Sequence, residues 1–124
     1  MTPEELADRL LTFAARIGKL VDALPDTRMG RHIAGQLVRC GTSPAPNYEE
    51  GCAAESRADF VHKLKLVLKE LRESRSWIRL IMKCELLPIA KVSDLHDESC
   101  QLCNIIGQSV VTSKGLNKID KGSE

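Results

Sequence analysis

The amino-acid sequence predicts an all-α fold, a single bundle of four helices. Four stretches carry apolar residues at spacings close to three or four, the period of a helix with one buried face. Only four of the 124 residues are aromatic, so the core must consist mainly of Leu, Ile, Val, Ala and Met, which suits packed helices better than sheets. A chain of this length forms one domain, predicted over residues 1–115, with a flexible tail over residues 116–124.

The first helix is predicted to begin after Thr2, a good N-cap, with Pro3 at its first position. Pro25 is expected to end it, because proline cannot continue a helix. The buried face repeats at spacings of four and three, and it consists of Leu6, Leu10, Phe13, Ile17, Leu20 and Leu24.

The second helix begins near Thr27 or Arg28 and is expected to bury Met29, Ile33 and Leu37. A row of polar side chains at helical spacing follows: Gln36, Cys40, Ser43, Asn47 and Glu50. Unpaired polar groups cost about 1–3 kcal/mol each when buried, so the row favours a structural hydrogen-bond network over an acid–base site. The predicted members of this polar seam are Gln36, Arg39, Ser43, Asn47, Glu50 and Glu70.

Two prolines interrupt the second helix. Pro44 and Pro46 each remove a backbone N–H and crowd the carbonyl four residues earlier, which predicts a kink or a short break. Ser43 and Asn47 are expected to cap the backbone groups that the prolines free. The segment after Gly51 is either a turn or a continuation of the helix.

The third and longest helix is predicted over Ser56–Leu87 and has three distinct faces. The core face consists of Phe60, Leu64, Val67, Leu71, Ser74, Ile78 and Ile81. A second apolar face includes the candidate oligomer-interface residues Trp77, Leu80 and Cys84, which a partner subunit would cover, and it ends at Leu87. The third face, here called the basic stripe, points to solvent and consists of Lys65, Lys69, Arg72, Arg79 and Lys83.

The fourth helix is predicted to begin at Ser93 as N-cap and to end at Gly115, a natural residue for a helix C-terminus. Its buried face consists of Leu95, Leu102, Ile106 and Val110. Gly107 and the β-branched pair Val110-Val111 make this helix intrinsically weak, so packing must hold it.

Composition narrows the function classes. The formal net charge of +1 argues against an evenly basic nucleic-acid coat, although one face can still be basic. The absence of a membrane-length apolar run or leader pattern predicts a cytoplasmic protein, and five cysteines without a framework spacing predict reduced thiols. His96, Cys100 and Cys103 share a helical face but have no obvious fourth ligand, so no metal or cofactor is expected.

Several residues, spread over the second and third helices, resemble the pattern of the four helix bundle protein family, also called the 23S rRNA intervening-sequence protein family. The resemblance extends over about residues 5–112 and is carried by Gln36-Leu37, Arg39, Ser43, Asn47, Glu50-Gly51, Ser56, Asp59-Phe60, Leu64, Glu70-Leu71, Ser74, Trp77 and Leu80. The pair Pro44 and Pro46, where the family has a single proline, departs from the pattern, as does Cys40-Gly41 after the arginine.

The resemblance implies an up-down-up-down bundle that assembles into a ring-like homopentamer without enzymatic activity. It also relates the chain to the accessory variability determinants of diversity-generating retroelements, which bind nucleic acid and a reverse transcriptase. The expected function is therefore a non-catalytic nucleic-acid-associated protein that binds RNA or DNA through the basic stripe. The alternative is a protein-binding scaffold on which the stripe is an ordinary solvated face, offset by Glu70 and Glu73.

Two further residue sets could contribute to the same surface. Arg9, Arg16 and Lys19 of the first helix could extend the basic stripe. Trp77 could stack on a base, but an interface or core position is favoured because the chain has too few other aromatics to form a stacking platform.

Overall fold

The structure is a computed structural model that describes the backbone of residues 1–122 and the side chains of residues 1–115. Within the described backbone, all regular secondary structure is helical, as the sequence predicted. The elements are α1 (Pro3–Ala23), α2 (Arg28–Thr42), α3 (Pro44–Cys52), α4 (Arg57–Lys83), the 3₁₀ turn η1 (Ile89–Lys91) and α5 (Ser93–Gly122).

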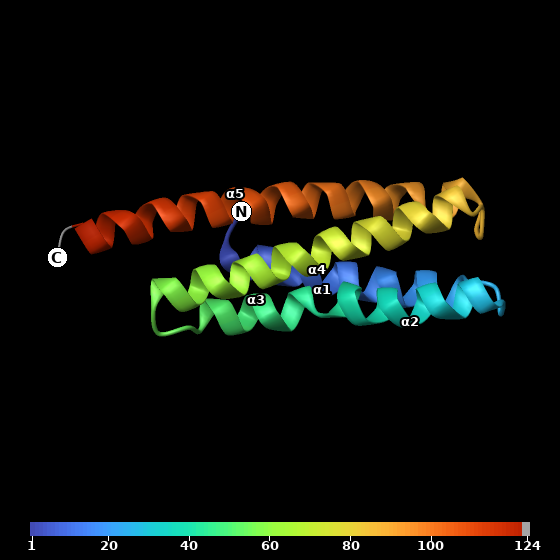
Figure 1. The fold of residues 1–124 in the computed structure, drawn as a ribbon, viewed down its shortest axis with the longest axis horizontal. Helices are drawn as coiled ribbons and strands as arrows, with labels where there is room; N and C mark the ends of the chain where they lie inside the picture. Colours follow the sequence, from blue (N-terminus) through green and yellow to red (C-terminus); the bar gives the residue numbers. More distant parts are fainter. Residues whose placement is uncertain (123–124) are drawn as a thin grey trace.

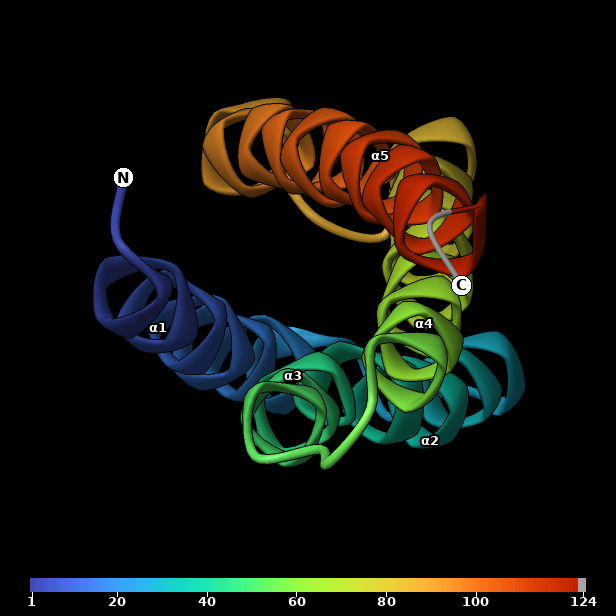
Figure 2. The same cartoon turned by 90° about the vertical axis from the view of Figure 1, so that its left-hand side faces the viewer.

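The helices lie side by side as a bundle, in which α2 and α3 together occupy the place of one rod (Figure 1). The connections at residues 24–27 and 84–92 lie at one end, and the connection at residues 53–56 lies at the other. Figure 2 shows α4 between the α2–α3 rod and α5, in agreement with the contacts that α4 makes with all three helices. The contacts between α1 and α5 are sparser than those that α4 makes with its neighbours.

The predicted core faces are buried. Leu10, Phe13 and Ile17 of α1 have no solvent-exposed surface, and the core faces of α4 and α5 pack against them, although Phe60 remains half-buried. Close approach of α1 and α2 depends on Gly41, because a Cβ there would lie 2.8 Å from two carbon atoms of Ile17. A helix-period pattern therefore predicts the core well, since burial follows the face rather than the individual residue.

Three helix starts follow the sequence, whereas α5 includes Ser93, the predicted N-cap, as its first residue. Thr2 and Glu5 form a capping box, in which the Glu5 N–H donates to the Thr2 hydroxyl at 3.1 Å and the Thr2 N–H donates to the Glu5 carboxylate at 3.0 Å. Thr27 caps α2 by accepting a hydrogen bond from the Gly30 N–H, and Ser56 caps α4 in the same way.

The expectation that Met29 is buried is wrong. Its side chain is 46 % exposed, and Gly30 occupies the covered position instead. A Cβ on Gly30 would lie 2.1 Å from the Pro25 carbonyl oxygen, so the chain crosses directly above this residue as it enters α2. The buried face of α2 consequently starts one residue later than the apolar pattern indicated.

The predicted break at the prolines is confirmed. The helix α2 ends at Thr42 and α3 starts with Pro44, while Ser43 between them keeps helical dihedral angles, φ −72° and ψ −36°. The Asn47 side-chain amide donates to the Ser43 carbonyl and to the Ser43 hydroxyl, both at 2.9 Å. The prediction is therefore met in part: the Asn47 side chain caps the Ser43 carbonyl, whereas the Ser43 side chain makes no capping hydrogen bond to the backbone.

Two predicted helix ends are wrong. The helix α4 stops at Lys83 rather than Leu87, because Glu85 turns the chain with a positive φ of 52°. The Leu86 N–H then donates to the Ile81 carbonyl and the Glu85 N–H to the Met82 carbonyl, the pattern of a Schellman motif.

The predicted end of the last helix at Gly115 is also wrong, since α5 continues to Gly122. A glycine in an exposed helix costs only about 1 kcal/mol relative to alanine, which the rest of a long helix can offset. The predicted flexible tail, residues 116–124, lies outside the described side chains.

No helix among residues 1–122 combines the length and the apolar character needed to cross a membrane.

Candidate functional site

The basic stripe lies along the exposed side of α4. All five of its side chains are exposed, and they extend from Lys65 to Lys83 over a helix rise of about 27 Å. Among the side chains that the structure describes, none of the five forms an ion pair with a carboxylate. Their positive charge therefore faces water, and no carboxylate of residues 1–115 is paired with it.

The neighbouring acidic residues of α4 are held elsewhere. Glu70 and Glu73 both bind the guanidinium of Arg39 on α2, Glu70 at 3.3 Å. Glu70 is buried, with only 10 % of its side chain exposed. If the basic stripe were an ordinary solvated face, Glu70 and Glu73 would offset its positive charge. Both carboxylates instead bind Arg39 of α2.

The Arg39 cluster joins α2 to α4 through several further contacts. Arg39 also donates to the side-chain oxygen of Gln36 at 3.3 Å, and the indole N–H of Trp77 donates to Glu73 at 3.0 Å. The Trp77 ring meets His32 edge to face, with ring centroids 5.6 Å apart. The cluster fixes how the two helices meet, which is the structural purpose predicted for the polar seam.

A second cluster occupies the α3 side of the seam. Lys63 of α4 donates to the Glu50 carboxylate at 2.7 Å and to the Asn47 side-chain oxygen at 3.3 Å. The predicted seam is thus two clusters, one on each side of the proline break. Ser43, Asn47 and Glu50 belong to this one, and Gln36, Arg39 and Glu70 belong to the Arg39 cluster.

The sequence reading missed Lys63 and Glu73 as partners in these clusters. The signal was available in the spacing, because Lys63, Glu70 and Trp77 follow one another at heptad intervals and Glu73 lies three residues after Glu70. Within the seam, Glu70 accepts from Arg39, and Glu50 accepts from Lys63.

The candidate interface residues lie at the edge of the core. Trp77 and Leu80 are half-buried and pack against the apolar core of their own subunit, and Cys84 is exposed. Part of this apolar face therefore remains accessible at the end of α4. The predicted contact with a second subunit stays a prediction.

The cysteines are free thiols. Cys40 is fully buried, and burial raises the pKa of its thiol to about 11, although the Ser74 hydroxyl donates to its sulfur at 3.3 Å. Burial likewise raises the pKa of Cys103. Thiols held protonated in this way are poor nucleophiles and poor metal ligands at neutral pH.

His96 lies 3.9 Å from Cys100, measured from Nε2 to Sγ, but the described part of the chain holds no group of three metal-binding side chains.

Arg9 of α1 does not extend the basic stripe. It binds Glu98 of α5 through two hydrogen bonds, at 2.7 Å and 2.8 Å, and so joins α1 to α5.

Comparison with known proteins identifies the relatives of this chain. The family model described as 23S rRNA-intervening sequence protein matches residues 5–108. The chain belongs to this family. The match includes both polar clusters and the whole basic stripe, so the features described above lie within the family domain of the 23S rRNA-intervening sequence proteins.

A solved structure with the same fold supports this assignment. It is a protein of unknown function from the S23 ribosomal protein family of Bacteroides thetaiotaomicron, with 29% sequence identity and a TM-score of 0.75. The similarity covers 85% of this chain and 97% of the other. The comparison with curated proteins gives no match.

Proposed function

We propose that this 23S rRNA-intervening sequence protein is a non-catalytic, nucleic-acid-associated accessory protein that binds RNA or DNA through the basic stripe. The observation that carries the proposal is the charge separation on α4. Five cations are exposed and unpaired among the described side chains, while Glu70 and Glu73 bind Arg39. A rise of about 27 Å corresponds to about eight nucleotides of a B-form strand, enough for several phosphate contacts.

Assembly is the second part of the proposal. Up-down-up-down bundles would associate as a homopentamer through Trp77, Leu80 and Cys84 at the edge of the core. A ring would present the basic stripe five times, so contacts that are individually weak would add as avidity. In this cytoplasmic role the protein would also contact a reverse transcriptase of a diversity-generating retroelement.

Fluorescence anisotropy of labelled 20-nucleotide RNA, single-stranded DNA and duplex DNA, over a range of salt concentrations, tests the nucleic-acid proposal. If all five cations contact phosphates, log K for the duplex should fall against log salt with a slope of about −4.5 per subunit engaged. Reversing Lys65, Lys69 and Arg72 to Glu should abolish binding. A matched triple reversal of Arg28, Arg31 and Lys114, exposed residues outside α4, should weaken it much less.

The alternative function is a protein-binding scaffold, which the overall charge of +1 favours. It predicts no detectable affinity for any of the three polynucleotides at low salt, or an affinity that the α4 triple reversal leaves unchanged. Either result would replace the nucleic-acid proposal by the scaffold.

A further inference from the structure

A cavity of about 390 Å³ opens between the C-terminal half of α1 and the segment where η1 leads into α5. Leu20, Leu87 and Leu95 supply its apolar wall, and Leu20 and Leu95 are otherwise buried side chains of the core. The cavity lies along the α1–α5 side of the bundle, where helix contacts are sparser than those that α4 makes with its neighbours. Its volume falls within the range of small-molecule sites in proteins.

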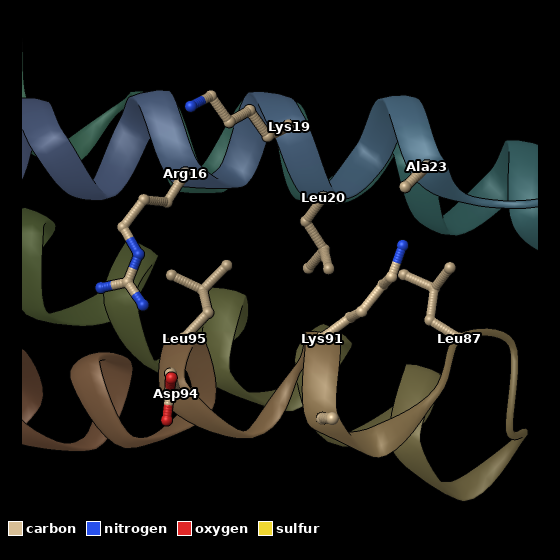
Figure 3. A pocket seen from close by; sticks show the side chains of 9 residues that line it. Arg16, Lys19, Leu20, Ala23, Leu87, Lys91, Asp94 and Leu95 are labelled. Carbon is tan, nitrogen blue, oxygen red and sulfur yellow. The ribbon is translucent and has the colours of Figure 1, made fainter.

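Two cations extend into this cavity from opposite sides. Figure 3 shows the Arg16 guanidinium reaching from α1 toward α5 beside Leu95, and the Lys91 ammonium reaching from the η1 side toward α1 beside Leu87. Lys19 also lines the cavity, but its side chain runs along α1 away from the space between the helices. Within residues 1–115 neither Arg16 nor Lys91 forms an ion pair, so both charges are available to a ligand.

We propose that this cavity binds a small amphiphilic anion, with a carboxylate or phosphate group held by Arg16 and Lys91 and a hydrocarbon body against Leu20, Leu87 and Leu95. The guanidinium offers parallel N–H donors that match either acid group, and the ammonium offers a second charge from across the opening. The leucines give a hydrocarbon body an apolar surface to pack against, so removing that body from water adds to the binding free energy.

One residue opposes the anion. Asp94 of α5 also lines the cavity, and it has no ion-pair partner among the described side chains. A carboxylate at this position repels a bound anion, so its charge limits affinity. Removing that charge is therefore expected to tighten binding, the opposite of what removing Arg16 or Lys91 does.

The site is independent of the basic stripe, because none of its residues belongs to α4. Isothermal titration calorimetry of the full chain with octanoate, octyl phosphate and 1-octanol tests the proposal. Both anions should bind, and 1-octanol should bind at least tenfold more weakly because it lacks the charge that Arg16 and Lys91 recognise. The ratio of the two anion affinities identifies which acid group the site prefers.

Variants separate a specific site from general attraction. Arg16→Gln and Lys91→Gln should each weaken anion binding about tenfold or more, and Asp94→Asn should strengthen it several-fold. Lys19→Gln is the matched control, since it removes the same charge from the same rim without withdrawing a group from the cavity, and its effect should stay within about twofold. All four positions are at least partly exposed, so circular dichroism should show folded proteins.

Three results would overturn the proposal. The first is the absence of any heat of binding with either anion at millimolar concentration. The second is equal affinity for 1-octanol and octanoate. The third is a loss of anion affinity in Lys19→Gln as large as that in Arg16→Gln. The α4 triple reversal should leave octanoate binding unchanged, so failure of this site and failure of the nucleic-acid proposal are distinguishable.

Discussion

Glu85 shows how a single residue sets the shape of a helix end. It adopts a positive φ of 52° immediately after the C-cap Cys84, the place where a glycine is usual. A side chain in this region of φ and ψ brings its Cβ close to the following carbonyl and costs about 1 kcal/mol. The surrounding Schellman hydrogen bonds hold the residue there despite the cost.

Glu85→Gly is therefore expected to raise the free energy of unfolding by about 1 kcal/mol, because glycine adopts this conformation without the Cβ conflict. Urea unfolding followed by circular dichroism measures the change. Glu85→Ala is the matched control, since it removes the same carboxylate but keeps the Cβ, and it should give little gain. Equal stability of the two variants would mean that the positive φ carries no cost here.

At the scale of the element, the Asn47 side chain bridges the proline break between α2 and α3. Asn47 donates to Ser43 at two acceptors and accepts from Lys63, so one amide joins both sides of the break and also α4. The sequence predicted the break because proline chemistry acts locally, and it predicted the cap by Asn47, but the Ser43 side chain does not cap the backbone as expected. The sequence did not reveal Lys63, because a partner on another helix is decided by packing.

Asn47→Ala should lower the free energy of unfolding by about 1–2 kcal/mol, as expected for losing hydrogen bonds at a part-buried helix start. Glu49→Ala, a substitution of an exposed neighbour on the same helix, should change it by less than about 0.5 kcal/mol. Chemical denaturation of both variants checks the prediction. A loss in Asn47→Ala no larger than in Glu49→Ala would contradict a capping role.

The same contrast between local and tertiary signals explains which other expectations succeeded. The core faces of α1, α4 and α5 were predictable because apolar periodicity fixes which side of a helix is buried. The exposure of Met29 was not predictable, because it depends on how the chain at Pro25 crosses Gly30. The end of α4 was not predictable either, because it depends on one dihedral angle at Glu85. At the site, the sequence located the basic stripe but not the pairing of Glu73 with Arg39.

At the scale of the whole molecule, the half-buried residues at the end of α4 bear on assembly. If a second copy covers Leu80 and Cys84, Leu80→Glu should reduce the mass measured by light scattering by placing a charge in the contact. Cys84→Glu tests the same surface from an exposed position, where the subunit's own fold should tolerate the change. Helical circular dichroism should be retained in both variants.

The wild type should have a mass near five chains, about 69 kDa, given 13.7 kDa for one. A wild-type mass of 13.7 kDa would exclude the assembly. An unchanged mass in both variants would place the contact elsewhere on the molecule. Reversal of Glu49, an exposed residue of α3 toward the opposite end of the bundle, serves as a surface-charge control.

Arg39 links two properties that seem unrelated, the docking of α2 on α4 and the electrostatic potential outside α4. Because it holds Glu70 and Glu73 on its own side, replacing it with an uncharged residue would release two negative charges beside the row of lysines and arginines. Attraction for a polyanion could thus be tuned in evolution from a helix that need not touch the polyanion.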